Sequence, residues 1–176
     1  MSRGAVLGID IGGGHISAGL YVPSPSSDLQ LVASEETPNA ADSLPSLLNQ
    51  LLALVGRLLD VAGGVRVLGV GIGVPGQVHR GVLVAASNLP YLRQADLAGE
   101  VGGRLGVPAR LFNDANCAIA AEVLGAERRR TAAMLTLGTG VGLGLVIEGR
   151  PYSGDRGMVE GGHSILVPGG RRCSIE

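Results

Sequence analysis

The sequence predicts an α/β fold followed by the beginning of a second, similar unit. Three observations lead to this prediction. Runs rich in Val, Ile and Leu at residues 5–11, 15–22 and 29–36 are separated by turn residues, as in consecutive strands. A helical pattern and a buried-strand pattern follow them. A glycine-rich strand–turn–strand pattern then recurs over residues 132–148, which indicates an internal duplication.

The remaining elements follow from periodicity and from start and stop residues. A helix is expected to begin at Asp42 or Ser43, to tolerate Pro45 in its first turn, and to end at Gly63 and Gly64. Its apolar positions recur with helical spacing: Leu44, Leu47, Leu48, Leu51, Leu54, Val55, Leu58 and Leu59. The later elements expected are a strand at 65–74, a hairpin at 76–85, a helix at 96–105, a strand at 109–112, a helix from 114 or 115 to 124, and strands at 132–137 and 143–148.

The duplication sets an expectation for the domains. The stretches LGIDIGGGHISAGLYV and LTLGTGVGLGLVIEG both place a glycine-rich turn after an apolar strand. We expect a first α/β lobe over residues 1–112 and the beginning of a second over 113–176. A full second copy would extend the chain well beyond about 250 residues at usual domain sizes, so the chain is expected to be incomplete.

The composition excludes several classes of function. The net charge of −1 gives no field to attract nucleic acid or an anionic membrane. Aromatic residues make up 2%, too few for the stacking surfaces of single-strand binders. The longest apolar run, residues 134–147, is too short to span a bilayer. We therefore expect small-molecule partners, and neither nucleic acid nor a membrane.

Basic residues and cysteines narrow the chemistry further. All 14 basic residues are arginine, which excludes a Schiff base and a P-loop lysine. Cys117 and Cys173 form no disulfide framework, so a reducing, cytoplasmic setting is expected. No signal peptide is expected, because the sequence reaches Asp10 before an apolar signal-peptide core could form. His15 and His79 have no partner at metal-ligand spacing and are expected at the surface.

Two glycine-rich turns are candidate phosphate sites. Gly12, Gly13 and Gly14 follow Asp10, and their N–H groups suit phosphate oxygens while Asp10 would hold Mg²⁺ directly or through water. A tight hairpin with Asp10 as a turn residue is the alternative. The second turn contains Gly138, Thr139 and Gly140, for which a glycine-rich sheet edge is the alternative. A G-x-G-x-x-G match at Gly71, Gly73 and Gly76 opens no helix and is not a dinucleotide site.

Two polar clusters are candidates for substrate chemistry. In FNDAN, Asp114 would accept a proton from a hydroxyl group while Asn113 orients the same substrate; a helix cap is the alternative for Asp114. In GMVEGGH, Glu160 and His163 could reach a polyol, and a solvated loop is the alternative. His163 and Cys173 make half of a zinc site at best, because structural zinc needs four ligands.

These stretches together resemble the ROK family of sugar kinases and sugar-responsive repressors, a branch of the actin-like, ribonuclease-H-like fold. GIDIGGG, GVGIGVPGQV, ASNLPY, FNDANCAIAAE, TLGTGVGLGLVIEG and GMVEGGH occur in the family's order. The resemblance implies two α/β lobes with a mixed sheet, ATP and Mg²⁺ in a cleft, and a homodimer at full length. It implies Asp114 as the catalytic base. The sugar ligands it implies are Asn113, Glu160, His163, Asn88 and Glu176, and the turns after Asp10 and Leu137 would hold the ATP phosphates.

The sequence also departs from the family pattern. Gly14 stands where a Thr is usual, which removes a phosphate-facing hydroxyl, and His15 stands where a Lys is usual. The zinc loop of the family has one His and three Cys, whereas this chain ends in GGRRCSIE. Structural zinc is therefore not expected, and the place of Glu176 in the sugar site is open.

Two functions follow from this pattern. The first is ATP-dependent phosphorylation of a hexose or amino sugar, because positioning, Mg²⁺ and one carboxylate base are enough for that reaction. The second is a non-catalytic sugar-binding or regulatory protein, or an inactive kinase fragment. We expect no DNA binding, since only MSRGAV stands ahead of the first loop motif, LGIDIGGG, and no basic patch is present.

Overall fold

The computed structural model describes residues 3–24, 29–125, 130–138 and 140–170. Its internal contacts divide the chain into two compact units, Met1–Asp114 and Ala115–Glu176. The lobe boundary expected between residues 112 and 113 concerns the whole protein and stays a prediction.

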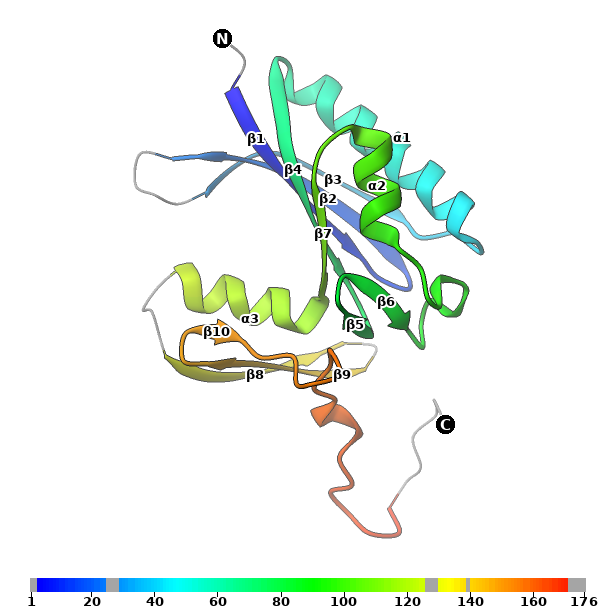
Figure 1. Ribbon diagram of the computed structural model, residues 1–176, viewed down its shortest axis with the longest axis vertical. Helices are drawn as coiled ribbons and strands as arrows, with labels where there is room; N and C mark the ends of the chain where they lie inside the picture. Colours follow the sequence, from blue (N-terminus) through cyan, green and yellow to red (C-terminus); the bar gives the residue numbers. More distant parts are fainter. Residues whose placement is uncertain (1–2, 25–28, 126–129, 139, 171–176) are drawn as a thin grey trace. The chain divides into compact units, whose positions relative to one another are not determined.

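A five-stranded mixed sheet forms the centre of the first unit, with the order β3-β2-β1-β4-β7 (Figure 1). Its strands are β1 (Arg3–Ile11), β2 (His15–Pro23), β3 (Leu29–Pro38), β4 (Val65–Val74) and β7 (Ala109–Asn113). The first three form an antiparallel meander, whereas β4 runs parallel to β1 and β7 runs parallel to β4. The carboxyl ends of β1, β4 and β7 therefore meet at one edge of the sheet, where Asp10 and Asn113 lie.

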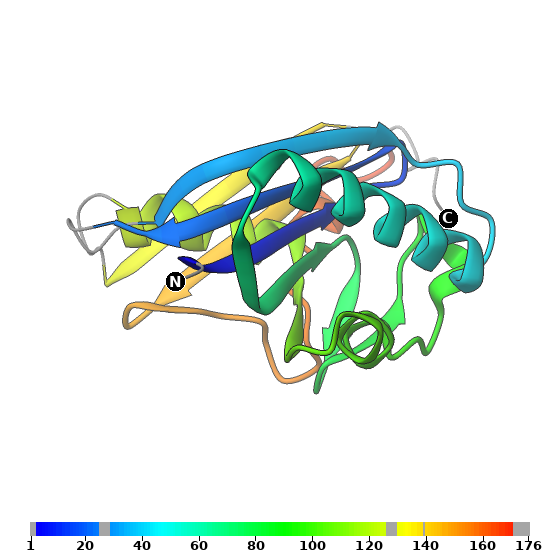
Figure 2. The same ribbon diagram turned by 90° about the horizontal axis from the view of Figure 1, so that it is seen from above.

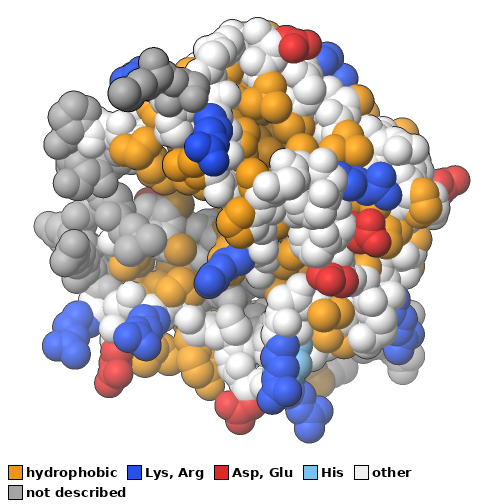
Figure 3. Space-filling view, turned by 45° about the horizontal axis from the view of Figure 1, so that its top comes forward, with side chains coloured by type: hydrophobic (Ala, Val, Ile, Leu, Met, Phe, Trp, Pro, Cys, Tyr) orange, Lys and Arg blue, Asp and Glu red, His pale blue; other side chains and the backbone are white. Residues whose placement is uncertain are grey.

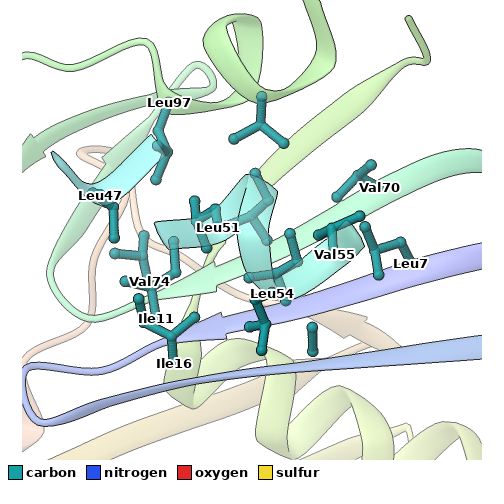
Figure 4. Packing of buried hydrophobic residues seen from close by; sticks show 14 of the residues in the cluster. Leu7, Ile11, Ile16, Leu47, Leu51, Leu54, Val55, Val70, Val74 and Leu97 are labelled. Carbon is teal, nitrogen blue, oxygen red and sulfur yellow. The ribbon is translucent and has the colours of Figure 1, made fainter. Parts of the chain in front are cut away.

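Two helices cover one face of this sheet. α1 (Leu44–Ala62) lies against β2 and β3, and α2 (Leu97–Leu105) lies against β4 and β7 (Figure 2). The buried side chains of α1 join those of the alternating strand positions in a single apolar core, shown in Figure 4. Burying a Leu or Val in this way contributes about 1.5–3 kcal/mol each. The side chain of Ser43 caps α1 and that of Asp96 caps α2.

α1 is the one helix among the described residues that is long and apolar enough to cross a membrane. Six of its side chains are buried: Leu47, Leu48, Leu51, Leu54, Val55 and Leu58. They belong to the core of the first unit, which is the place of a core helix in a globular domain. On the surface drawn in Figure 3, arginine and acidic side chains are interspersed with hydrophobic ones.

The second unit consists of short elements around a small sheet. α3 (Asp114–Gly125) leads into β8 (Thr131–Leu137), β9 (Val141–Ile147) and β10 (Arg150–Pro151), which pair in the order β10-β9-β8. The 3₁₀ helix η2 (Gly161–His163) follows. Buried Ile119 and Val123 of α3 pack with Val146 of β9.

Most of the predicted elements are confirmed. The hairpin predicted at 76–85 is formed by β5 (Gln77–His79) and β6 (Val82–Ala85), so a strand, and no helix, begins directly after Gly76. Two strand limits were wrong: β3 continues to Pro38, and β9 begins at Val141 rather than at residue 143. The β8–β9 turn is shorter than expected because strand pairing begins at once, with Leu137 opposite Val141. The 3₁₀ helices, η1 (Pro90–Leu92) and η2, and the short strand β10 are too short for periodicity to indicate them.

Candidate functional site

The turn between β1 and β2 has the form of a closed hairpin. The last strand pair is Ile11 with Ile16, and the Gly12 N–H donates to the His15 carbonyl at 2.8 Å. Gly13 and Gly14 are exposed at the tip. Within the described residues, no acceptor is found for the N–H groups of these two glycines. Of the predicted phosphate-binding amides, that of Gly12 is therefore used by the hairpin, and Gly13 and Gly14 carry the exposed donors.

Asn39, which the sequence analysis did not single out, holds this turn. Its Nδ2 donates to the Gly12 carbonyl at 2.7 Å, and its backbone N–H donates to the Gly14 carbonyl at 3.0 Å. Its own Oδ1 accepts the N–H of Ala41 at 3.1 Å. Two of the three turn carbonyls are thus occupied. The turn presents N–H donors to solvent, as binding of an anion requires.

Asn88, a predicted sugar ligand, lies beside the same turn. A Cβ on Gly13 would come 3.1 Å from the Asn88 Cβ and 3.5 Å from its carbonyl oxygen. A side chain at residue 13 would therefore push this segment away. Gly14 is different, because a Cβ there would meet nothing within 4 Å. A side chain is therefore excluded at Gly13 by the neighbouring Asn88, whereas no neighbour excludes one at Gly14.

Asp10 and Asp114 interact electrostatically within the first unit. Asp10 is exposed at the sheet edge, but the surrounding protein excludes part of the water that would hydrate its carboxylate. This loss of hydration raises the pKa of the Asp10 carboxyl, the Asp114 carboxylate raises it further, and His15 lowers it. The two carboxylates are therefore electrostatic neighbours, although they are far apart in sequence.

Asn113 fixes the position of Asp114. Its Nδ2 donates to the Asp114 Oδ1 and to the Gly76 carbonyl, both at 3.1 Å. Gly76 has φ of +102°, and a Cβ there would collide with the Ala85 carbonyl. Only glycine fits position 76 well. The Gly76 carbonyl accepts a hydrogen bond from Asn113 and so fixes its side chain, which orients the carboxylate of Asp114 through a second hydrogen bond.

The second predicted phosphate turn lies in the other unit. The Gly138 N–H donates to the Gly140 carbonyl at 2.9 Å, and both glycines are exposed. Thr139 lies outside the described residues.

The glycines farther along β9 have a packing role: a Cβ on Gly142 would collide with Thr136 Oγ1, and one on Gly144 would lie 2.5 Å from the Ala115 carbonyl.

The predicted sugar-binding loop of the second unit packs against β9. A side chain on Gly161 would collide with Leu143, and one on Gly162 with the Val141 carbonyl. These two glycines let η2 lie directly on the strand that follows the 138–140 turn. Glu160 and His163 flank them, with 3.7 Å between Glu160 Oε2 and His163 Nε2.

A buried hydrogen bond supports the segment that leads to this loop. Asn116 of α3 is buried, and its Nδ2 donates to Ser153 Oγ at 2.9 Å. Farther along, Gly154 has φ of +61° and lies close to the Met158 carbonyl. The segment that leads to Glu160 is therefore attached to α3 by the hydrogen bond between Asn116 and Ser153.

Within the described part of the chain, no three His, Cys, Asp or Glu side chains lie close enough together to hold a metal ion. Cys173 and Glu176 lie outside that part, so the expectation about structural zinc stays a prediction. Magnesium needs fewer protein ligands, because it commonly takes one or two carboxylates with phosphate and water oxygens. Asp10 fits that requirement.

The comparison with known families adds one finding. The ROK family matches residues 6–175 of the chain. The chain belongs to the ROK family. The resemblance found in the sequence motifs is therefore confirmed.

Relatives of this ROK chain are sugar kinases. N-acetyl-D-glucosamine kinase of Erwinia tasmaniensis is 36% identical over 164 residues, covering 90% of this chain and 52% of the relative. Glucokinase of Streptomyces coelicolor is 31% identical over 175 residues, covering 97% and 52%. The ROK glucokinase of Streptomyces griseus, solved with glucose and AMPPNP, matches with a TM-score of 0.79 and 28% identity, covering 93% and 51%.

The chain thus spans about half the length of the curated relatives that it matches. The predicted fold class is confirmed, since the mixed five-stranded sheet is present and the structural neighbours are ROK kinases of the actin-like fold.

Proposed function

We propose that the full-length protein is a kinase that transfers the terminal phosphoryl group of ATP to a hydroxyl group of a hexose or an N-acetylhexosamine. The observation that carries this proposal is the meeting of Asp10 and Asp114 at the carboxyl edge of the sheet, beside a turn that exposes N–H donors. Ligands of open α/β sheets bind outside this edge. The kinase names of the relatives support the same reaction.

Asp114 is the base in this proposal. Its carboxylate accepts the proton of the sugar hydroxyl while the hydroxyl oxygen forms a bond to the γ-phosphorus of ATP. The bond from that phosphorus to the bridging oxygen breaks, and ADP leaves with the electron pair. The proton stays on Asp114 until it passes to water. The hydrogen bond from Asn113 keeps the carboxylate in one orientation before the substrate arrives.

Asp10 would hold Mg²⁺ directly or through water. The negative charge of Asp114 and the loss of hydration both raise the pKa of Asp10, so a divalent cation beside it would relieve an unfavourable concentration of charge. When bound, Mg²⁺ neutralises charge on the phosphates. In the first unit, the turn that contains Gly13 is the proposed phosphate-binding element. Through the family resemblance, the turn that contains Gly138 and Gly140 has the same proposed role in the second unit.

Through the family resemblance, Asn88 and Asn113 of the first unit are proposed sugar ligands. Glu160 and His163 of the second unit are proposed sugar ligands on the same ground. Glu160 Oε2 and His163 Nε2 lie 3.7 Å apart, so these two side chains offer hydrogen-bonding groups close together, which suits neighbouring sugar hydroxyls. Glu176 and a homodimeric state belong to the same proposal through the family resemblance.

The test is Asp114→Asn in the full-length protein, with release of ADP measured on glucose and on N-acetylglucosamine. We expect kcat to fall at least about 100-fold, the scale of a lost general base, with sugar affinity nearly unchanged. Asp60→Asn, on the exposed face of α1, is the matched control. An unchanged kcat would refute the role of Asp114. Sugar binding by the unmodified protein without any ADP release would favour a non-catalytic sensor.

A further inference from the structure

Asn116, in the first turn of α3, is a buried polar side chain of the second unit. It is 8% exposed, and within the described part of the chain no other polar or charged residue is buried. Burying an amide costs free energy unless it is hydrogen-bonded. The Asn116 Nδ2 donates to Ser153 Oγ at 2.9 Å, and the two residues are 37 positions apart in the chain. The bond therefore joins the start of α3 to a distant segment.

The first turn of α3 is also held against β9. A Cβ on Gly144 would lie 2.5 Å from the Ala115 carbonyl, and one on Gly142 would lie 3.4 Å from the Ala115 Cβ. Glycine at both positions lets the strand approach the helix closely. Because α3 begins with Asp114, the proposed base, the helix turn that carries this residue is fixed by its packing on the strand.

The segment that contains Ser153 leads to the proposed sugar-binding loop. At its start, the Tyr152 N–H donates to a carbonyl of β9 at 2.8 Å. At its end, Gly161 lies so close to β9 that a side chain there would collide with the strand. Between these two attachments, the hydrogen bond from Asn116 attaches the segment to α3. The loop that carries Glu160 is therefore held by both the strand and the helix.

We propose that Asn116 is a positioning residue, which through its hydrogen bond to Ser153 holds the sugar-binding loop in a fixed relation to the helix turn that begins with Asp114. This inference rests on the proposed function and adds a residue that does not itself contact the substrate. Phosphoryl transfer needs the sugar hydroxyl aligned with the base, so a small displacement of the loop lowers the rate. A buried bond between loop segment and helix restricts that displacement before the sugar arrives.

The experiment breaks this hydrogen bond from either side in the full-length protein. Asn116→Ala and Ser153→Ala should each weaken binding of the sugar that is phosphorylated, glucose or N-acetylglucosamine, about fivefold by calorimetry, the scale of one lost hydrogen bond. The KM for that sugar should rise in parallel, while the KM for ATP stays unchanged. Ser153→Thr keeps the hydroxyl group and should bind sugar like the unmodified protein. Asn49→Ala and Ser34→Ala, at exposed positions of α1 and β3, are the matched controls.

The double variant tests whether the two residues act as a pair. Asn116→Ala combined with Ser153→Ala should bind sugar no more weakly than Asn116→Ala alone, because the same bond is lost only once. Additive losses would overturn the inference, since the two side chains would then act separately.

Two further outcomes separate positioning from folding and from the proposed function. Unchanged sugar affinity in Ser153→Ala would overturn the inference and leave the proposed function standing. Equal rises in the KM for ATP and for sugar, with a lowered Tm, would also overturn it, because the bond would then only stabilise the fold. If the unmodified protein bound sugar without releasing ADP, the proposed function would fail, whereas the sugar affinities of the variants would still decide the role of Asn116.

Discussion

The two glycine-rich hairpins, β1–β2 and β8–β9, are alike in sequence but use their glycines differently. In the first, Asn39 holds the turn carbonyls and Asn88 lies against Gly13, so the turn is anchored and its remaining donors face solvent. In the second, the turn closes on itself, and the glycines that lack room for a side chain lie in the strand, at Gly142 and Gly144.

This difference shows that glycine density has two separate physical causes. One is a backbone that must expose its N–H groups to a ligand, and the other is a strand that must let a neighbouring element approach closely. A motif with several glycines does not tell which cause applies at which position. Substitution of single glycines and of their neighbours can separate the two causes.

The largest effect on stability is expected at Gly144. Gly144→Ala would bring a methyl group against the Ala115 carbonyl and Ile119 of α3, so we expect a loss of about 1–3 kcal/mol in the free energy of unfolding, as for an overpacked core. Gly138→Ala is the control, because nothing described lies within 4 Å of its added Cβ. Urea unfolding of the full-length variants measures both. Equal free energies of unfolding for the two variants would contradict the packing role proposed for Gly144.

An intermediate effect is expected at Asn39. Asn39→Ala removes the hydrogen bond to the Gly12 carbonyl and loosens the donor turn, so the KM for ATP should rise about tenfold, equivalent to about 1.4 kcal/mol, within the range of one well-placed hydrogen bond. The KM for sugar should change less. Asn49→Ala, on the exposed face of α1, serves as the control. An unchanged KM for ATP would mean that the first turn needs no anchor.

A smaller gain is expected at Gly14. The position has open space for a side chain and no positive φ, so Gly14→Thr can place a hydroxyl near the phosphates without strain. We expect up to about 1 kcal/mol of added nucleotide affinity from one hydrogen bond. Calorimetric ATP titration of this variant and of Gly14→Ala separates the hydroxyl from the added carbon. Weaker ATP binding by the Thr variant would contradict the proposal that a side chain at residue 14 lies near the bound phosphates.

The smallest effect is expected at Asp10. Because its pKa is raised in the folded protein, the folded state holds the proton more firmly than the unfolded state. The associated stability is present below the unfolded pKa and is lost as the pH rises through the folded pKa. Asp10→Asn should therefore raise the Tm at neutral pH without Mg²⁺, and this advantage should shrink in acid. A lower Tm at neutral pH would show that the carboxylate stabilises the fold.

Much of the fold could be predicted from the sequence because its signals are local. Helical spacing of leucines, the capping Ser43 and the stop at Gly63 define α1 within one stretch of chain. The same is true of the β1–β2 hairpin, where apolar strands flank a glycine turn. The ordered motifs also pointed to the ROK family, which the match over residues 6–175 confirms.

The candidate site could be predicted only in part. Asp10 and Asp114 stand at the ends of predicted strands, and parallel pairing brings their ends to one edge of the sheet. Asn39 was missed because an Asn after a Pro is an ordinary turn residue in sequence. Its role depends on Gly12, which lies 27 residues away along the chain.

The sequence by itself determined the main elements, the two glycine turns and the family, and it supplied the residues that are proposed to carry the chemistry. These follow from local periodicity, turn propensity and the kinds of side chain present. Only the tertiary structure decided which groups meet: Asn39 with Gly12, Asn113 with Gly76 across 37 residues, and Gly13 with Asn88. Such contacts depend on strand order and loop paths, so the packing of distant segments, and no single stretch of chain, fixes them.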